Sequence, residues 1–114
     1  MLSKKHRLTY QEFSQNPHYG KKFNSRTFFL TFKQANNTLS RFTILVPKTL
    51  DKRSSYRNRA KRITVEIIRQ YLINNLKEGT DVLVRLRRII LKQEQSIREE
   101  LIEVFNREGL LNPK

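Results

Sequence analysis

Three segments of the chain alternate apolar and polar residues with a period of two, which predicts β-strands. They span residues 26–33, 41–46 and 81–88. Their inward-facing residues form the predicted core and are Phe28, Leu30, Phe32, Phe42, Ile44, Val46, Val82, Val84 and Leu86. The polar segment 34–40 contains Asn36-Asn37 and predicts a hairpin between the first two strands. Phe29 falls on the opposite face, either as a partly covered hydrophobe or as an exposed surface for stacking bases.

Apolar residues at helical spacing predict three helices. They span residues 8–14, about 56–76 and about 93–107. Thr9 is the expected N-cap of the first, with Glu12 at the capping-box position, and Ser54 or Ser55 is the expected N-cap of the second. The apolar stripes of the second and third helices are Ala60, Ile63, Ile67, Ile68, Tyr71 and Leu72, and Ile97, Leu101, Val104 and Phe105. With room for a short extra strand in the 47–55 connector, this order predicts a small α+β sandwich on a mixed or antiparallel sheet.

The length and residue usage narrow the class of protein. The 114 residues predict a single domain spanning 1–114, with residues 1–6 as a mobile basic N-terminus. There is no cysteine, which excludes disulfides, thiolate metal sites and a cysteine nucleophile. No apolar run approaches the roughly 18 residues that a membrane helix needs, so we expect a cytoplasmic protein without a membrane partner.

The formal net charge of +14 is concentrated in the first half of the chain. Residues 1–62 hold 15 Lys and Arg against 2 acids, a net charge of +13, whereas residues 63–114 hold 9 against 8, a net charge of +1. A surface built only for solubility would mix the two signs throughout. The asymmetry therefore favours a polyanion partner over a basic face that is merely solvated.

The cations are densest where the second predicted helix begins. Arg57, Arg59, Lys61 and Arg62 repel one another by about 0.2–0.5 kcal/mol per i,i+4 pair and lie at the positive end of the helix dipole. A polyanion lying across the helix start would offset both costs. Asn58 adds no charge. It is either an ordinary polar helix-start residue or a specific hydrogen-bonding group for a sugar, a base or a metal-bound water.

Residues suited to catalysis are scarce. The basic half contains only Glu12 and Asp51 as acids, in different predicted elements, so it offers no carboxylate cluster for catalytic metal ions. His6 and His18 are better explained as surface or phosphate-contacting residues than as an acid–base pair. The acids of the last predicted helix are expected to face solvent and are Glu99, Glu100 and Glu103. The sequence therefore predicts a binding protein with no catalytic residue and no metal site of its own.

The segment Tyr56 to Arg62, YRNRAKR, resembles the arginine-asparagine-arginine signature of the bacterial ribonuclease P protein subunit. In that signature the triplet is followed one residue later by two basic residues. The resemblance covers almost the whole chain. Its other parts are Arg7-Leu8 ending a basic start, Phe13 on a short helix, Gly20 in the next loop, Arg26-x-Phe28 in a strand, a strand led by Asp81, and a C-terminal helix.

The resemblance implies the fold and the role of that family. The fold has a left-handed strand–helix–strand crossover, and the role is to assist an endonuclease that removes 5′ leaders from precursor tRNA. A catalytic RNA performs the Mg²⁺-dependent hydrolysis, so Mg²⁺ and this RNA subunit are the implied cofactors. The implied partners are the ribonuclease P RNA, one per protein, and precursor tRNA. The alternative is a ribosomal or other structural RNA-binding protein with no role in cleavage, and the missing carboxylate cluster argues against an autonomous nuclease.

The resemblance also assigns residues by position. The RNA-binding signature, called here the RNR segment, is Arg57, Asn58, Arg59, Lys61 and Arg62. Further RNA contacts are expected at Lys4, Lys5, Arg7, Lys21, Lys22 and Arg69. The cleft for the single-stranded leader is expected to be lined by Phe13, Phe28, Phe29, Thr31 and Arg85. Stacking of a base in such a cleft contributes about 1–3 kcal/mol.

Overall fold

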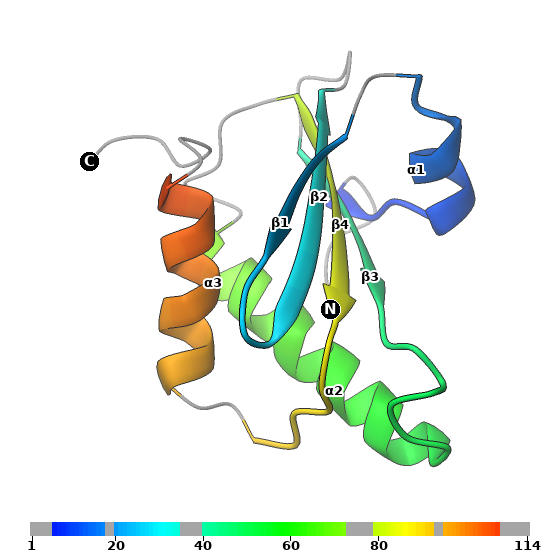
Figure 1. Cartoon of the computed structure of the whole chain (residues 1–114), viewed down its shortest axis with the longest axis vertical. Helices are drawn as coiled ribbons and strands as arrows, with labels where there is room; N and C mark the ends of the chain where they lie inside the picture. Colours follow the sequence, from blue (N-terminus) through cyan, green and yellow to red (C-terminus); the bar gives the residue numbers. More distant parts are fainter. Residues whose placement is uncertain (1–5, 18–19, 35–39, 73–78, 93–94, 108–114) are drawn as a thin grey trace.

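The computed structural model describes residues 6–17, 20–34, 40–72, 79–92 and 95–107. Its elements, in chain order, are α1 (Tyr10–Gln15), β1 (Lys21–Asn24), β2 (Phe28–Gln34), β3 (Arg41–Leu45), α2 (Ser54–Ile67), the π-helix η2 (Ile68–Leu72), β4 (Thr80–Leu86) and α3 (Gln95–Arg107). Figure 1 shows the helices arranged around one sheet. Because η2 follows α2 directly, the two confirm the predicted second helix as far as Leu72. The predicted remainder, 73–76, lies outside the described residues.

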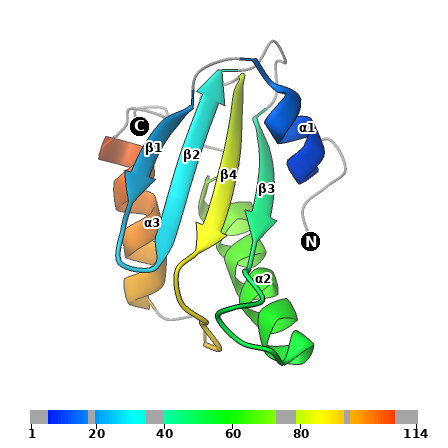
Figure 2. The same ribbon diagram turned by 45° about the vertical axis from the view of Figure 1, so that its right-hand side comes forward.

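The sheet has the strand order β1-β2-β4-β3 (Figure 2). β2 is antiparallel to both neighbours, and β3 is parallel to β4. The predicted hairpin between the first two predicted strands, 26–33 and 41–46, is therefore wrong, because β4 lies between the corresponding strands β2 and β3. Asn36-Asn37 lies outside the described residues.

The hairpin partner of β2 is β1, which was not among the strands predicted from the sequence. Its residues KKFN contain a single apolar side chain, Phe23, so no alternation marks them as a strand. The short extra strand expected in the 47–55 connector is also wrong, because residues 46–53 form turns and bends up to the start of α2.

The parallel strands β3 and β4 are joined through α2. In Figure 2 both strands point the same way, and α2 passes behind the sheet as the chain moves from β3 to β4. This crossover is left-handed, whereas about 98% of such connections are right-handed. The left-handed crossover implied by the family resemblance is confirmed.

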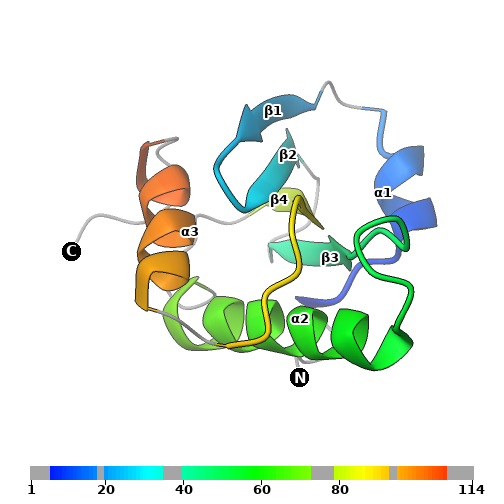
Figure 3. The ribbon, with the colours of Figure 1, turned by 60° about the horizontal axis from the view of Figure 1, so that its bottom comes forward.

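The hydrophobic core lies between the sheet and the helices α2 and α3, which cover one face (Figure 3). The predicted inward residues of β2, β3 and β4 are buried there, except that Val46, just beyond β3, is only half-buried. The stripe of α3 is confirmed as predicted. In α2 the sequence missed Thr64, which is fully buried beside Ala60 and Ile67. Its hydroxyl donates to the Ala60 carbonyl at 3.0 Å, so the buried polar group is satisfied.

The opposite, outer face of the sheet is covered only in part. α1 lies near the end of the sheet where β3 and β4 begin (Figure 2). Its predicted capping box is present: Thr9 Oγ1 accepts from the Glu12 N–H at 3.1 Å, and Glu12 Oε1 accepts from the Thr9 N–H at 3.1 Å. These bonds lower the pKa of Glu12, with the backbone N–H of Thr9 as the main cause.

Candidate nucleic-acid interface

The RNR segment occupies the first turns of α2, at the end of the sheet away from α1 (Figure 2). Asn58, Arg59, Lys61 and Arg62 are exposed, and the intervening Ala60 is fully buried. Within the described part of the chain none of the three exposed cations forms an ion pair. The helix also has no acidic residue in its first turn. Because no ion pair among the described residues neutralises this positive charge, the surface is suited to a polyanion.

Arg57 differs from the other cations of the segment. It is half-buried, and its Nη1 donates to the carbonyls of Asp51 at 2.8 Å and Lys52 at 3.0 Å. We expected Arg57 to supply charge for RNA contact like its neighbours. The structure shows that part of its guanidinium instead holds the connector that precedes the helix.

The start of α2 is also held by Asp51. Its carboxylate accepts from the Arg53 backbone N–H at 2.9 Å and from the Arg53 guanidinium at 3.0 and 2.9 Å. The Arg53 hydrogen bonds lower the pKa of Asp51 to about 2. The Arg53 guanidinium also stacks over the Tyr56 ring, 3.6 Å from its centroid. Because this turn places Arg53 at the N-cap, without a side-chain cap, the predicted cap at Ser54 or Ser55 is wrong.

A hollow of about 300 Å³ opens between the end of the sheet and the connector. It is lined by Phe29, Pro47, Thr49, Leu50, Arg85, Leu86 and Arg87. Phe29 and Arg85 pair directly across β2 and β4 on the outer face, and Phe29 is half-buried. Phe29 therefore combines the two readings that the sequence left open: it is partly covered and has a surface on the hollow. The sequence did not point to Pro47, Thr49 and Leu50, because a connector without regular structure gives no pattern from which to place them.

The other three residues expected in the cleft do not reach this hollow. Phe28 is fully buried on the inner face, since it follows the alternation that also makes it a core residue. Thr31 is 5% exposed and lies against Gly20, where an added Cβ would come within 2.7 Å of Thr31 Cγ2. Phe13 is 4% exposed and has Lys33 Nζ 4.4 Å from its ring centroid.

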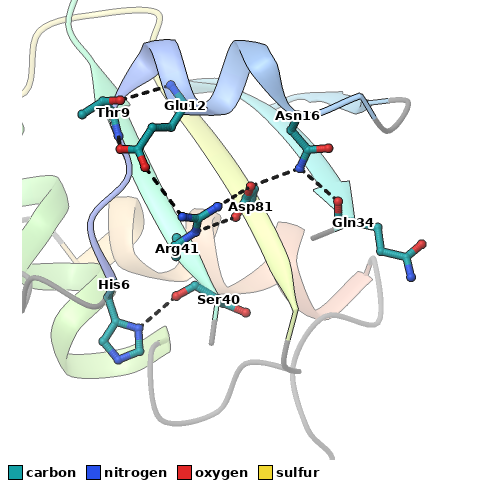
Figure 4. Close-up of polar contacts among 8 residues, drawn as sticks. All are labelled: His6, Thr9, Glu12, Asn16, Gln34, Ser40, Arg41 and Asp81. Carbon is teal, nitrogen blue, oxygen red and sulfur yellow. Dashed lines mark hydrogen bonds and ion pairs between the residues drawn. The ribbon is translucent and has the colours of Figure 1, made fainter. Parts of the chain in front are cut away.

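α1 is fixed by a charged row that crosses three strands of the outer face. Lys33, Asp81 and Arg41 are register partners on β2, β4 and β3. Arg41 donates from Nε and Nη2 to the two oxygens of Asp81, each at 3.1 Å, and lies 3.8 Å from Glu12 of α1 (Figure 4). Asn16, the C-cap of α1, donates to Asp81 at 3.1 Å, and Lys33 Nζ donates to the Phe13 carbonyl at 3.0 Å.

The further basic residues named from the sequence are spread over several surfaces. Arg7 is exposed and forms an isolated bridge with Phe42 at the edge of β3, where His6 Nδ1 donates to the Ser40 carbonyl at 2.9 Å (Figure 4). Lys21 and Lys22 are exposed on β1. Arg69 donates to Glu66, and this bond is the main cause that raises the pKa of Arg69. Lys4, Lys5 and His18 lie outside the described residues.

Glu100 does not face solvent as predicted. Its carboxylate accepts from the Thr27 N–H at 2.8 Å, from the Thr27 hydroxyl at 2.9 Å and from the Ser25 hydroxyl. This contact joins α3 to the turn between β1 and β2. The sequence could not reveal it, because 73 residues separate Thr27 from Glu100.

The described residues contain no group of three or more His, Asp or Glu side chains that could hold a metal ion. They therefore do not fit a resident Mg²⁺ site. None of the described helices has the length and apolarity that crossing a bilayer requires.

The left-handed β3–α2–β4 unit, the partly covered outer face and the exposed cations at the start of α2 define a small basic protein of the kind that accompanies RNA. A protein-family model described as Ribonuclease P matches residues 2–109. The chain belongs to this family, whose members are the protein component of the tRNA-processing ribonucleoprotein ribonuclease P.

Solved structures agree with this assignment. The RNase P protein of Thermotoga maritima is 25% identical, with a TM-score of 0.65 over 83% of this chain and 86% of that chain. The RNase P protein of Staphylococcus aureus is 22% identical, with a TM-score of 0.70 over 100% and 97%. A mutant of the Staphylococcus aureus protein, described as defective in mRNA degradation, is 19% identical, with a TM-score of 0.78 over 95% and 92%. The comparison with curated proteins returned no match.

Proposed function

We propose that this chain binds the catalytic RNA of ribonuclease P through the RNR segment and holds the 5′ leader of precursor tRNA in the hollow beside Phe29. One protein serves one RNA subunit, and the RNA performs the hydrolysis. The observation that carries the proposal is the row of exposed, unpaired cations on the first turns of α2, beside a hollow with an aromatic ring and two arginines. Arginine forks suit phosphates, and the Phe29 ring suits a base.

The division of labour follows from the residues. The described part of the chain offers no carboxylate cluster, so Mg²⁺ is assigned to the RNA and to its phosphates. The protein then contributes charge neutralisation at the RNA backbone and orientation of the leader. Both effects lower the Mg²⁺ concentration that the RNA needs, because protein cations replace part of the metal that would otherwise screen phosphate repulsion.

The test is cleavage of precursor tRNA by a bacterial ribonuclease P RNA with and without the purified chain, as a function of Mg²⁺ concentration. We expect the protein to lower the Mg²⁺ requirement. Phe29→Leu should weaken binding of leader-bearing precursor by about 5- to 150-fold, the equivalent of one lost stacking contact, with no effect on mature tRNA. Tyr10→Leu is the matched control, because Tyr10 is 54% exposed on α1 and does not line the hollow.

One outcome would favour the alternative of a structural RNA-binding protein. That outcome is tight binding to the RNA with an unchanged Mg²⁺ requirement and the same affinity for precursors with and without a leader.

A further inference from the structure

Four exposed arginines at the end of the sheet where β4 finishes form no ion pair in the described part of the chain. They are Arg26, Arg85, Arg87 and Arg88. Four other arginines each pair with a carboxylate and are Arg41, Arg53, Arg69 and Arg107. Unpaired arginines gathered at one end of a sheet raise the local positive potential.

The turn that carries Arg26 is held in one shape. The Ser25 N–H donates to the Phe28 carbonyl at 2.8 Å, and the Phe28 N–H donates to Ser25 Oγ at 3.1 Å. Glu100 binds the same turn through Thr27 and Ser25. The Glu100 carboxylate thus accepts from a backbone N–H and two hydroxyls, and in the described part of the chain it forms no ion pair with these arginines.

Arg87 and Arg88 are attached to the same turn. The Arg87 N–H donates to the Thr27 carbonyl at 2.7 Å, and Arg87 Nη1 donates to the Ser25 carbonyl at 2.7 Å. Arg88 Nε donates to Thr27 Oγ1 at 3.2 Å. A guanidinium has five N–H donors, so each side chain retains four for a ligand. Because Arg87 also lines the hollow, the hollow adjoins the turn to which Arg87 and Arg88 are attached.

We propose that Arg26, Arg87 and Arg88, the turn arginines, form a second binding site for RNA phosphates, continuous with the hollow, and that these phosphates belong to the leader nucleotides farthest from the cleavage site. The inference rests on the proposed function, because the leader must first occupy the hollow. Aromatic rings that stack bases, followed by cations that track the backbone, are the usual means of holding a single strand. Three guanidinium groups on preorganised loops supply the second part.

The experiment uses the full chain assembled with ribonuclease P RNA, and precursors with leaders of about two and about ten nucleotides. In the variant Arg26→Gln/Arg87→Gln/Arg88→Gln we expect about ten-fold weaker binding of the long-leader precursor and unchanged binding of the short one. The salt slope for the long leader should fall by about two, since each single-strand phosphate contact contributes about 0.7. Arg107→Gln, which removes an exposed cation on α3, is the matched control and should change neither slope.

Two variants separate phosphate binding from a change in the turn. Arg26→Gln alone should lower the long-leader slope by about 0.7 and leave the turn intact, because the Arg26 side chain forms no hydrogen bond or ion pair with the described residues. Glu100→Gln loosens the turn but keeps all three cations, and should lose less affinity than the triple variant.

Equal losses for Glu100→Gln and the triple variant would overturn the proposal, as would equal losses for both leader lengths. Weaker binding of the catalytic RNA alone would show that the phosphates belong to that RNA and would overturn the assignment to the leader. Failure of the wild-type chain to lower the Mg²⁺ requirement would instead count against the proposed function.

Discussion

Asp81→Asn is expected to release α1 from the sheet and to lower the free energy of unfolding by about 2–3 kcal/mol. The Asp81 side chain is 1% exposed and accepts two hydrogen bonds from Arg41 and one from Asn16 (Figure 4). An asparagine of the same shape removes the charge and turns one acceptor into a donor that faces other donors. α1 has six residues, too few for a helix that is stable without tertiary contacts.

The magnitude follows from the exposure of the two partners. Removing one member of a buried ion pair costs about 3–5 kcal/mol, because the other charge is left buried and unpaired. Here the Arg41 side chain is 25% exposed and also lies 3.8 Å from Glu12, so solvent and Glu12 compensate part of the loss. For a domain of this size, about 2–3 kcal/mol corresponds to a decrease in Tm of roughly 8–12 °C.

The assay is urea denaturation of Asp81→Asn, Arg41→Gln and the double variant, with hydrogen exchange of the α1 amides. The double variant should be more stable than the sum of the single effects predicts, with a coupling of at least about 1 kcal/mol. Glu103→Gln is the control, since it removes an exposed ion pair with Arg107 on α3 and should change stability by less than about 0.5 kcal/mol. Additive effects at Asp81 and Arg41, or a loss as small as that of the control, would refute the reasoning.

Two further predictions concern the start of α2. Arg59→Ala should reduce the slope of log affinity for the catalytic RNA against log salt concentration by about one. Asn58→Ala should lower cleavage activity with little change in this slope. Equal slopes for the two variants would show that their roles are misassigned. Asp51 has a pKa lowered to about 2, so its contribution to stability is complete above its unfolded pKa of 3.8 and is lost as the pH falls toward 2. An NMR titration should place the Asp51 midpoint near 2, and nearer 3.8 in Arg53→Gln; a wild-type midpoint near 4 would contradict the contact.

The sequence predicted those parts of the fold that depend on neighbouring residues. The capping box of α1 lies within four consecutive residues, and the alternation in β2 and β4 repeats every two residues. The strand order could not be predicted in the same way. β1 and the position of β4 between β2 and β3 depend on contacts between residues far apart in sequence, and a Lys-rich edge strand carries no apolar alternation.

The candidate site divides in the same manner. The RNR segment could be predicted because its residues are contiguous in the sequence. Their exposure follows from the helical spacing, which buries Ala60 and turns its neighbours toward solvent. The hollow was predicted only through Phe29 and Arg85. The assignment by resemblance named residues along the whole strand, although alternate residues of a strand face opposite sides of the sheet. Phe28 faces the core, and Thr31 faces outward but is covered by Gly20, so neither lines the hollow.

Some acidic residues hold segments next to the basic residues of the candidate interface, so net charge alone does not predict how strongly that interface binds RNA. Asp51 and Glu100 each fix one segment at the arginine-rich end of the sheet: the connector before α2, and the turn that carries Arg26. Neutralising either of them raises the net charge, so a model based on charge alone predicts tighter RNA binding. The structure predicts the opposite direction, since the cations would then lie on segments that must be ordered again at each binding event. Under the proposed function, these two acids therefore support RNA binding by fixing the positions of the arginines.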